Sequence, residues 1–164
     1  MGGLAMNGQR VKRELMPMLV EDFMIGMPQT DYIITGSYRR GKADSGDVEL
    51  VFIPKNEHEC SILKAGIVKR FGLCATTLTP KMQGLWGNVQ FDLFVSYPTW
   101  LGAMLLHTTG SGQFNIEMRS RARVLGYTLN QYGLYRGDVP VLIADNEEIF
   151  FKHLGLTYKK PEER

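Results

Sequence analysis

The chain has 164 residues, 44% of them hydrophobic, and a formal net charge of +2. This length supports one domain or two small subdomains that share a cleft, and the composition excludes a disordered or fibrous protein. The N-terminus lacks an apolar signal core, and no run approaches the ~20 apolar residues that span a bilayer. The two cysteines have no metal-ligand spacing. We therefore expect an intracellular protein, in the cytoplasm or the nucleus, that does not bind membranes.

Hydrophobic spacing and turn residues predict the elements in chain order. The first half is predicted to hold a helix over 11–25, strands over 32–35 and 48–53, a helix over 57–71 ended by Gly72, and strands over 75–78 and 85–95, the last with a hairpin near Gly84 or Gly87. The second half is predicted to hold helices over 99–106 and 112–125, a β unit over 127–135 and 139–143, and a last helix capped at 145–148. This order indicates an α+β fold, with a mixed sheet followed by a smaller α+β portion.

The most informative motif is Gly36-Ser37-Tyr38-Arg39-Arg40-Gly41, followed shortly by Asp47-Val48-Glu49. A Gly-Ser turn can offer backbone N–H groups and a hydroxyl to phosphate, and an arginine adds a planar cation that suits phosphate. Residues two apart on a strand point to the same face, so both carboxylates can reach the same metal ions. Each motif alone is usually an ordinary turn or strand edge, and it is their adjacency and order that indicate phosphoryl or nucleotidyl transfer.

A third carboxylate, Asp92, interrupts the apolar run Gln90 to Val95. A charge in such a run is costly to bury unless it is paired or binds metal, although an exposed edge strand would also explain it. We expect Asp92 to lie on the strand next to that of Asp47 and Glu49. Three carboxylates could then share two divalent ions roughly 3.5–4 Å apart.

These residues resemble the active-site motif of family X DNA polymerases, a branch of the nucleotidyltransferase superfamily. Two further blocks resemble segments specific to family X: Thr109-Gly110-Ser111…Phe114-Asn115…Met118-Arg119 with Gly126 to Leu134, and the tail from Glu147 to Arg164. The resemblance runs from about Tyr32 to the C-terminus. It implies a nucleotidyltransferase palm over 1–106 and a C-terminal nucleotide- and template-binding subdomain over 107–164, without the helix-hairpin-helix portions of larger members, as in the smallest viral members.

The resemblance also implies a role for each site residue. Asp47, Glu49 and Asp92 would be catalytic and would hold two Mg²⁺ ions, for which Mn²⁺ can substitute. The nucleotide would be bound by Gly36, Ser37, Arg40, Gly46, Thr109, Gly110 and Asn115. Arg119 would reach the templating strand of DNA.

Three positions depart from the family pattern. Glu49 stands where Asp is usual, and two-metal chemistry is sensitive to the placement of the carboxylate oxygens. Thr108 stands where an aromatic residue usually backs a gate against the ribose 2′-hydroxyl, so we expect a weak gate. Gln90 stands where an arginine is common, so the support of Asp92 is expected to be lost or replaced.

The leading interpretation is a monomeric DNA-directed nucleotidyltransferase. It would add a nucleotide from a nucleoside triphosphate to a primer 3′-hydroxyl, in gapped or primer–template DNA, and fill short gaps during repair. Without further DNA-gripping portions its hold on DNA should be weak and salt-sensitive. The alternatives are template-independent addition to a 3′ end, a nucleotide- or DNA-binding homologue that Glu49 has impaired, and a small-molecule nucleotidyltransferase.

Overall fold

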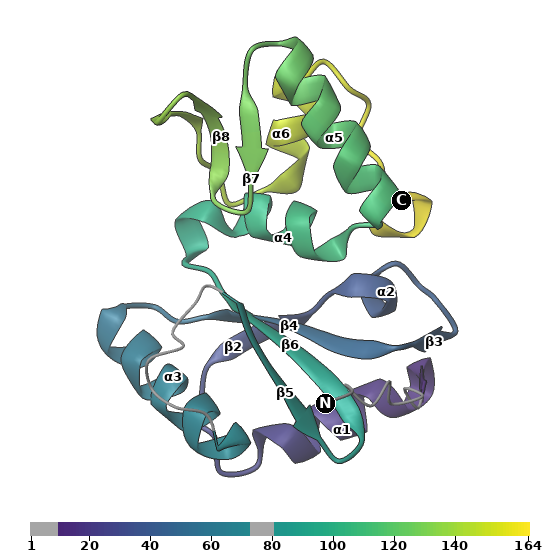
Figure 1. The fold of residues 1–164 in the computed structure, drawn as a ribbon, viewed down its shortest axis with the longest axis vertical. Coiled ribbons are helices and arrows are strands. Elements are labelled where there is room, and N and C mark those ends of the chain that lie inside the picture. The colour runs from purple at the N-terminus through teal and green to yellow at the C-terminus, as the bar shows by residue number, and fades with distance from the viewer. Residues whose placement is uncertain (1–9, 73–80) are drawn as a thin grey trace, which may run out of the picture.

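The computed structural model describes residues 10–72 and 81–164, which form two parts stacked on either side of helix α4 (Leu101–Thr109) (Figure 1). The first part holds a four-stranded mixed sheet and the second a three-stranded antiparallel sheet with two helices. The predicted strand over 75–78 lies outside the described residues. None of the helices within the described ranges is long and apolar enough to cross a membrane.

The first part opens with strand β1 (Val11–Lys12), a 3-10 turn (Arg13–Leu15) and helix α1 (Met16–Met24). The helix predicted over 11–25 therefore begins later, and Pro17 lies in its first turn, where its missing N–H costs no hydrogen bond. Strand β2 (Asp31–Ile34) leads into the short helix α2 (Gly36–Arg39). The predicted Gly-Ser turn is thus the first turn of a helix.

The sheet has the strand order β2-β4-β6-β5. Strand β4 (Asp47–Ile53) pairs antiparallel with β2 and parallel with β6 (Val89–Val95), while β5 (Lys81–Trp86) and β6 form a hairpin whose turn contains Gly87. The two-residue strand β3 (Asp44–Ser45) pairs with β1. Helix α3 (Glu57–Phe71) has the predicted bounds, because the Asn56 side chain caps its first turn and Gly72 ends it in the left-handed conformation.

The two faces of the sheet pack against different neighbours. One face buries Leu50, Phe52 and Leu93 in a core with residues of α1 and α3. On the other face, Val51 of β4 and Phe94 of β6 pack on Met104 of α4. Since side chains alternate along a strand, residues two positions before Val51 and Phe94 also face α4.

The second part contains helix α5 (Gly112–Val124), strands β7 (Thr128–Asn130), β8 (Gly133–Arg136) and β9 (Val139–Leu142), helix α6 (Glu147–His153) and a final 3-10 turn (Pro161–Glu163). Its core includes Phe114, Phe150 and Phe151, and Leu106 of α4 belongs to it. Helix α4 therefore contributes apolar side chains to both parts.

A triad of charged side chains joins the two parts, and we call it the Glu147 triad. Arg39 of α2 donates to Glu147 Oε2 at 2.6 Å, and Arg164 donates to Glu147 Oε1 at 2.6 Å. The Glu147 side chain is 5% exposed and that of Arg164 is fully buried. The Arg164 guanidinium also lies over the rings of Phe114 and Phe151. A buried carboxylate of this kind is stable only while both cations remain.

Replacing Glu147 with alanine should lower the free energy of unfolding by about 3 kcal/mol or more, because two guanidinium groups lose their buried partner. Urea denaturation measures this change. Glu148→Ala is the matched control, since Glu148 is exposed in the same helical turn, and it should change stability by less than about 0.5 kcal/mol. Similar stabilities for the two variants would contradict the role of the triad.

Candidate active site

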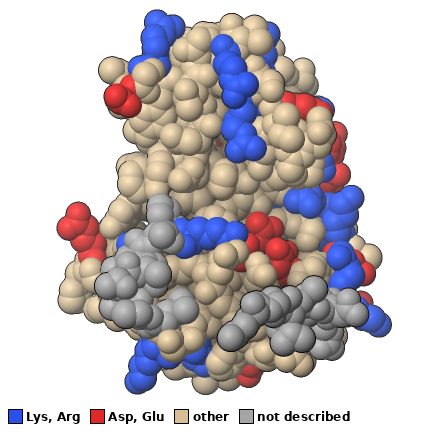
Figure 2. Space-filling model, viewed as in Figure 1, with Lys and Arg blue, Asp and Glu red and all other residues tan. Residues whose placement is uncertain are grey.

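The three predicted carboxylates lie on neighbouring strands. Asp47 and Glu49 are on β4 and Asp92 is on β6, with Glu49 directly paired with Asp92 in the parallel register. All three project from the sheet face that packs on α4. Figure 2 shows acidic side chains at the waist of the molecule, with basic side chains beside them. The predicted position of Asp92, on the strand next to the other two acids, is confirmed.

Burial and mutual repulsion alter the acid–base behaviour of these groups. Burial, followed by the charge of Asp92, raises the pKa of Asp47 above its ordinary value. Burial, followed by the charges of Asp47 and Asp92, raises the pKa of Glu49 to about 7, although Arg40 acts in the opposite direction. The cluster therefore carries like-charge repulsion that a bound cation would relieve.

The longer side chain of Glu49 lies against Gly36. A Cβ atom at Gly36 would collide with Oε2 and Cδ of Glu49, and the backbone there has a φ of 60°. Glycine is thus required at position 36 both for the backbone conformation and for the space that the glutamate occupies.

Three side chains hold Asp92 in place. Its Oδ1 accepts hydrogen bonds from Gln83 at 2.8 Å and from Gln90 at 2.9 Å, and its Oδ2 forms an ion pair with Lys81 Nζ at 2.7 Å. Gln90 therefore replaces the support that an arginine commonly gives. Sequence reasoning missed Lys81 and Gln83. Their i, i+2 spacing could have placed them on one face of a strand, and that strand pairs Gln83 with Asp92.

The donor chemistry of this cluster fits divalent metal ions, because Mg²⁺ and similar hard cations prefer carboxylate oxygens. In the described ranges, 10–72 and 81–164, no group of three His, Cys, Asp or Glu side chains converges as a ready-made metal site. Glu49 is turned toward Gly36, and Asp92 is bonded to Lys81. Glu49 would have to turn, and the Lys81 ammonium would have to leave Asp92, for all three carboxylates to ligate the same ions.

Four of the predicted nucleotide-binding residues meet where α2 approaches the end of α4. Arg40 donates to the Thr109 carbonyl, and a Cβ at Gly110 would lie 3.3 Å from Arg40 Nη1 and 3.8 Å from Asn115 Nδ2. Ser37 Oγ donates to Ser45 Oγ at 2.8 Å, close to the start of β4. Gly46 lies further out, where a Cβ would meet only Arg10. The structure thus brings together Arg40, Thr109, Gly110 and Asn115.

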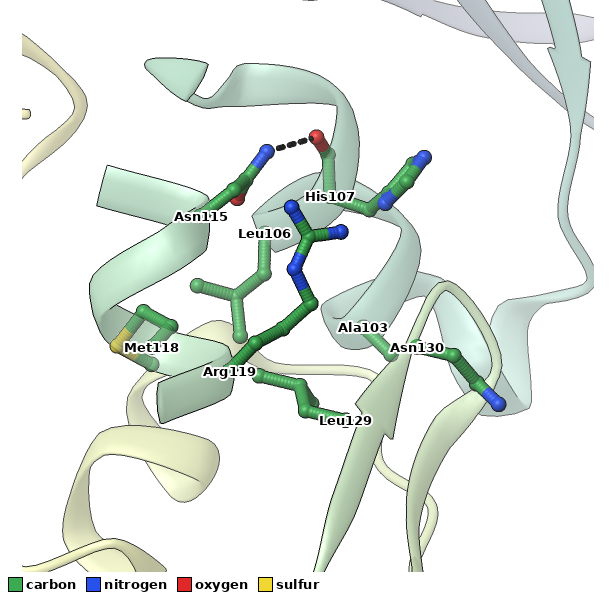
Figure 3. Close-up of a pocket in the computed structure, with 8 residues that line it drawn as sticks. All are labelled: Ala103, Leu106, His107, Asn115, Met118, Arg119, Leu129 and Asn130. Carbon is green, nitrogen blue, oxygen red and sulfur yellow. Dashed lines mark hydrogen bonds between the residues drawn. The ribbon is translucent and has the colours of Figure 1, made fainter. Parts of the chain in front are cut away.

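A small open pocket lies between α4, α5 and β7 (Figure 3). Its polar lining consists of His107, Asn115, Arg119 and Asn130, and Asn115 Nδ2 donates to the His107 carbonyl at 2.8 Å. The Arg119 guanidinium points toward the space between His107 and Asn115. Burial, followed by the charges of Arg119 and Lys81, lowers the pKa of His107, which favours a neutral imidazole at pH 7.

Thr108, the position expected to back a gate, does not line the pocket. Thr108 is buried, and its hydroxyl donates to the Met104 carbonyl at 2.9 Å. Successive helical residues point about 100° apart, so the neighbouring His107 is the side chain that lines the pocket. Sequence comparison by position alone could not show which of the two faces the pocket.

An arginine and a glycine turn lie beside a mixed sheet that carries three carboxylates. This arrangement is typical of a palm-type nucleotidyltransferase. Residues 12–110 match the family model of the DNA polymerase beta palm, and residues 104–164 match that of the DNA polymerase beta thumb. The two matches overlap within α4. The chain belongs to the family X DNA polymerases.

Relatives and solved structures agree with this membership. The chain is 27% identical over 168 residues to Repair DNA polymerase X of African swine fever virus, with 96% of each chain covered. It is 27% identical over 183 residues to human DNA-directed DNA/RNA polymerase mu, covering 84% of this chain and 37% of mu. The structure of Leishmania infantum polymerase beta in a ternary P/T complex shares the fold, with a TM-score of 0.71 at 24% identity over 95% of this chain and 77% of that one.

Glu49→Gln should stabilise the metal-free protein at pH 8 more than at pH 5. The pKa of Glu49 is raised from 4.5 to about 7, so ionisation opposes folding, and this cost grows as pH rises from 4.5 to 7. Removing the charge should raise the free energy of unfolding by about 1–3 kcal/mol at pH 8. Urea denaturation in EDTA measures the effect, with exposed Glu21→Gln as control. A gain that does not depend on pH would contradict the origin of the shift.

Proposed function

We propose that this polymerase adds a nucleotide to a primer 3′-hydroxyl by two-metal catalysis, and that it fills short gaps in DNA inside the cell. The observation that carries the proposal is the pairing of Glu49 with Asp92 on the sheet face that looks toward α4, near Arg40 and Thr109. We further propose that the palm spans 1–106 and the C-terminal subdomain 107–164. The name of the viral relative, a repair polymerase, supports a role in repair.

Each group of residues has a distinct task in this proposal. Ser37 and Arg40, with the backbone at Gly36 and Gly46, bind the triphosphate of the incoming nucleotide. In the free protein Arg40 donates to the Thr109 carbonyl, so nucleotide phosphate would compete with this contact. Gly110 brings the backbone close to the sugar and base, because any side chain there would crowd Arg40.

The carboxylates form the catalytic group. Asp47, Glu49 and Asp92 would hold two divalent ions, which would lower the pKa of the primer 3′-hydroxyl and stabilise the leaving pyrophosphate. Gln83 and Gln90 orient Asp92 toward the site through its Oδ1 atom.

Helix α5 provides the contact with the templating strand. Arg119 is exposed and Asn115 lies one turn before it, so both face the same side of the helix. Arg121 has a structural role instead, because its Nε donates to the Leu154 carbonyl at 2.8 Å. Arg123, four residues after Arg119, is the second arginine available on the Arg119 side for a DNA phosphate.

Asp92→Asn should abolish insertion into a one-nucleotide gap, with a loss of about a thousandfold or more, because a metal-ligating charge is removed while the shape is kept. Primer extension with each nucleotide measures the effect, and circular dichroism checks the fold. Exposed Asp138→Asn is the control and should retain wild-type rates. Near-native turnover by folded Asp92→Asn would sink the two-metal proposal, and equal extension of single-stranded DNA by the wild type would favour template-independent addition.

Glu49→Asp should raise the Mg²⁺-supported rate by about 10- to 100-fold and narrow the advantage of Mn²⁺. The longer glutamate must fold back to reach the ions, and Mg²⁺ tolerates less distortion of its octahedral geometry than a larger ion does. The comparison is single-turnover insertion with each ion. A slower Glu49→Asp variant in Mg²⁺ would show that the site has adapted to glutamate.

A further inference from the structure

The ammonium group of Lys81 is in direct contact with the carboxylate of Asp92. Lys81 opens β5, an edge strand of the sheet, and its Nζ lies 2.7 Å from Asp92 Oδ2. The Lys81 side chain is 42% exposed, whereas that of Asp92 is 7% exposed. The ammonium also lies 5.8 Å from the centroid of the Phe94 ring. The cation therefore covers Asp92 from the solvent side.

The two oxygens of Asp92 have different partners. Oδ1 accepts from two neutral amides, Gln83 and Gln90, and Oδ2 is paired with the charged ammonium. The two amides stand on the two strands of one hairpin, so Oδ1 keeps both partners when Oδ2 loses the ammonium. Oδ2 can thus change its partner while Asp92 keeps its orientation.

We propose that Lys81 competes with a divalent ion for Asp92, so that the ion binds only when the ammonium leaves Oδ2. This inference rests on the proposed function, because it takes Asp92 as a metal ligand. An ammonium and a divalent ion repel each other strongly at contact distance, and they would use the same oxygen. Lys81 therefore weakens ion binding in the free enzyme and keeps the acidic cluster compensated.

The lysine is able to leave. It lies at the first residue of an edge strand, half in solvent, on a flexible four-carbon stem. A strongly hydrated ammonium can return to water or turn to a phosphate of bound DNA. A guanidinium at this position would keep the charge and with it the competition.

A purely structural role for Lys81 predicts the opposite result. If the ammonium only aligned Asp92, its removal would loosen the carboxylate and weaken ion binding. If the ammonium competes, its removal should strengthen ion binding. The sign of the change separates the two roles.

The test is Mn²⁺ binding to the full chain without DNA, followed by electron paramagnetic resonance of free Mn²⁺. Lys81→Gln should lower the dissociation constant for Mn²⁺ by about tenfold, which corresponds to about 1.4 kcal/mol. Lys81→Arg should bind as the wild type does. Exposed Lys69→Gln, on α3, removes the same charge elsewhere and should leave binding unchanged.

Unchanged or weaker Mn²⁺ binding by Lys81→Gln would overturn the inference, as would an equal gain in Lys69→Gln. Asp92→Asn separates this failure from failure of the proposed function. If Asp92→Asn binds Mn²⁺ as tightly as the wild type, Asp92 is not a ligand and both ideas fall. If it loses Mn²⁺ while Lys81→Gln is unchanged, only the competition falls.

Discussion

The parallel pairing of β4 with β6 is the contact on which the site depends. It sets Glu49 directly beside Asp92, although the two residues are far apart in the sequence. The same register puts Val51 and Phe94 against Met104, so the acids are held beneath α4. Burying these acids side by side has a cost, because burial first, and then the charges of Asp47 and Asp92, raise the pKa of Glu49 to about 7. The same arrangement concentrates negative charge at one place, which favours the binding of cations.

Two neighbouring arginines near this site make different contacts. Arg39 and Arg40 are adjacent in α2, yet Arg39 joins the Glu147 triad while Arg40 meets the Thr109 carbonyl. Arg39 therefore ties the C-terminal part to α2, and Arg40, the residue proposed to bind phosphate, contacts the end of α4.

Local signals predicted the parts of the structure that are decided locally. The bounds of α3 follow from Asn56 and Gly72, and the placement of Asp92 follows from a charge in an apolar strand. The sequence did not show that Thr108 turns into the core, because rotation about a helix depends on what the helix packs against. The contacts of Lys81 and Glu147 were also missed, because their partners lie on other elements of the fold.

The central claim is that Asp47, Glu49 and Asp92 act as one ion-binding site. Anomalous scattering from crystals of the protein with Mn²⁺, nucleotide and primer–template DNA tests it most directly. We predict anomalous peaks at roughly 2.0–2.6 Å from oxygens of all three carboxylates, with the Lys81 ammonium displaced from Asp92. Peaks that contact none of these carboxylates, or a Lys81 that still pairs with Asp92 beside a bound ion, would contradict the account.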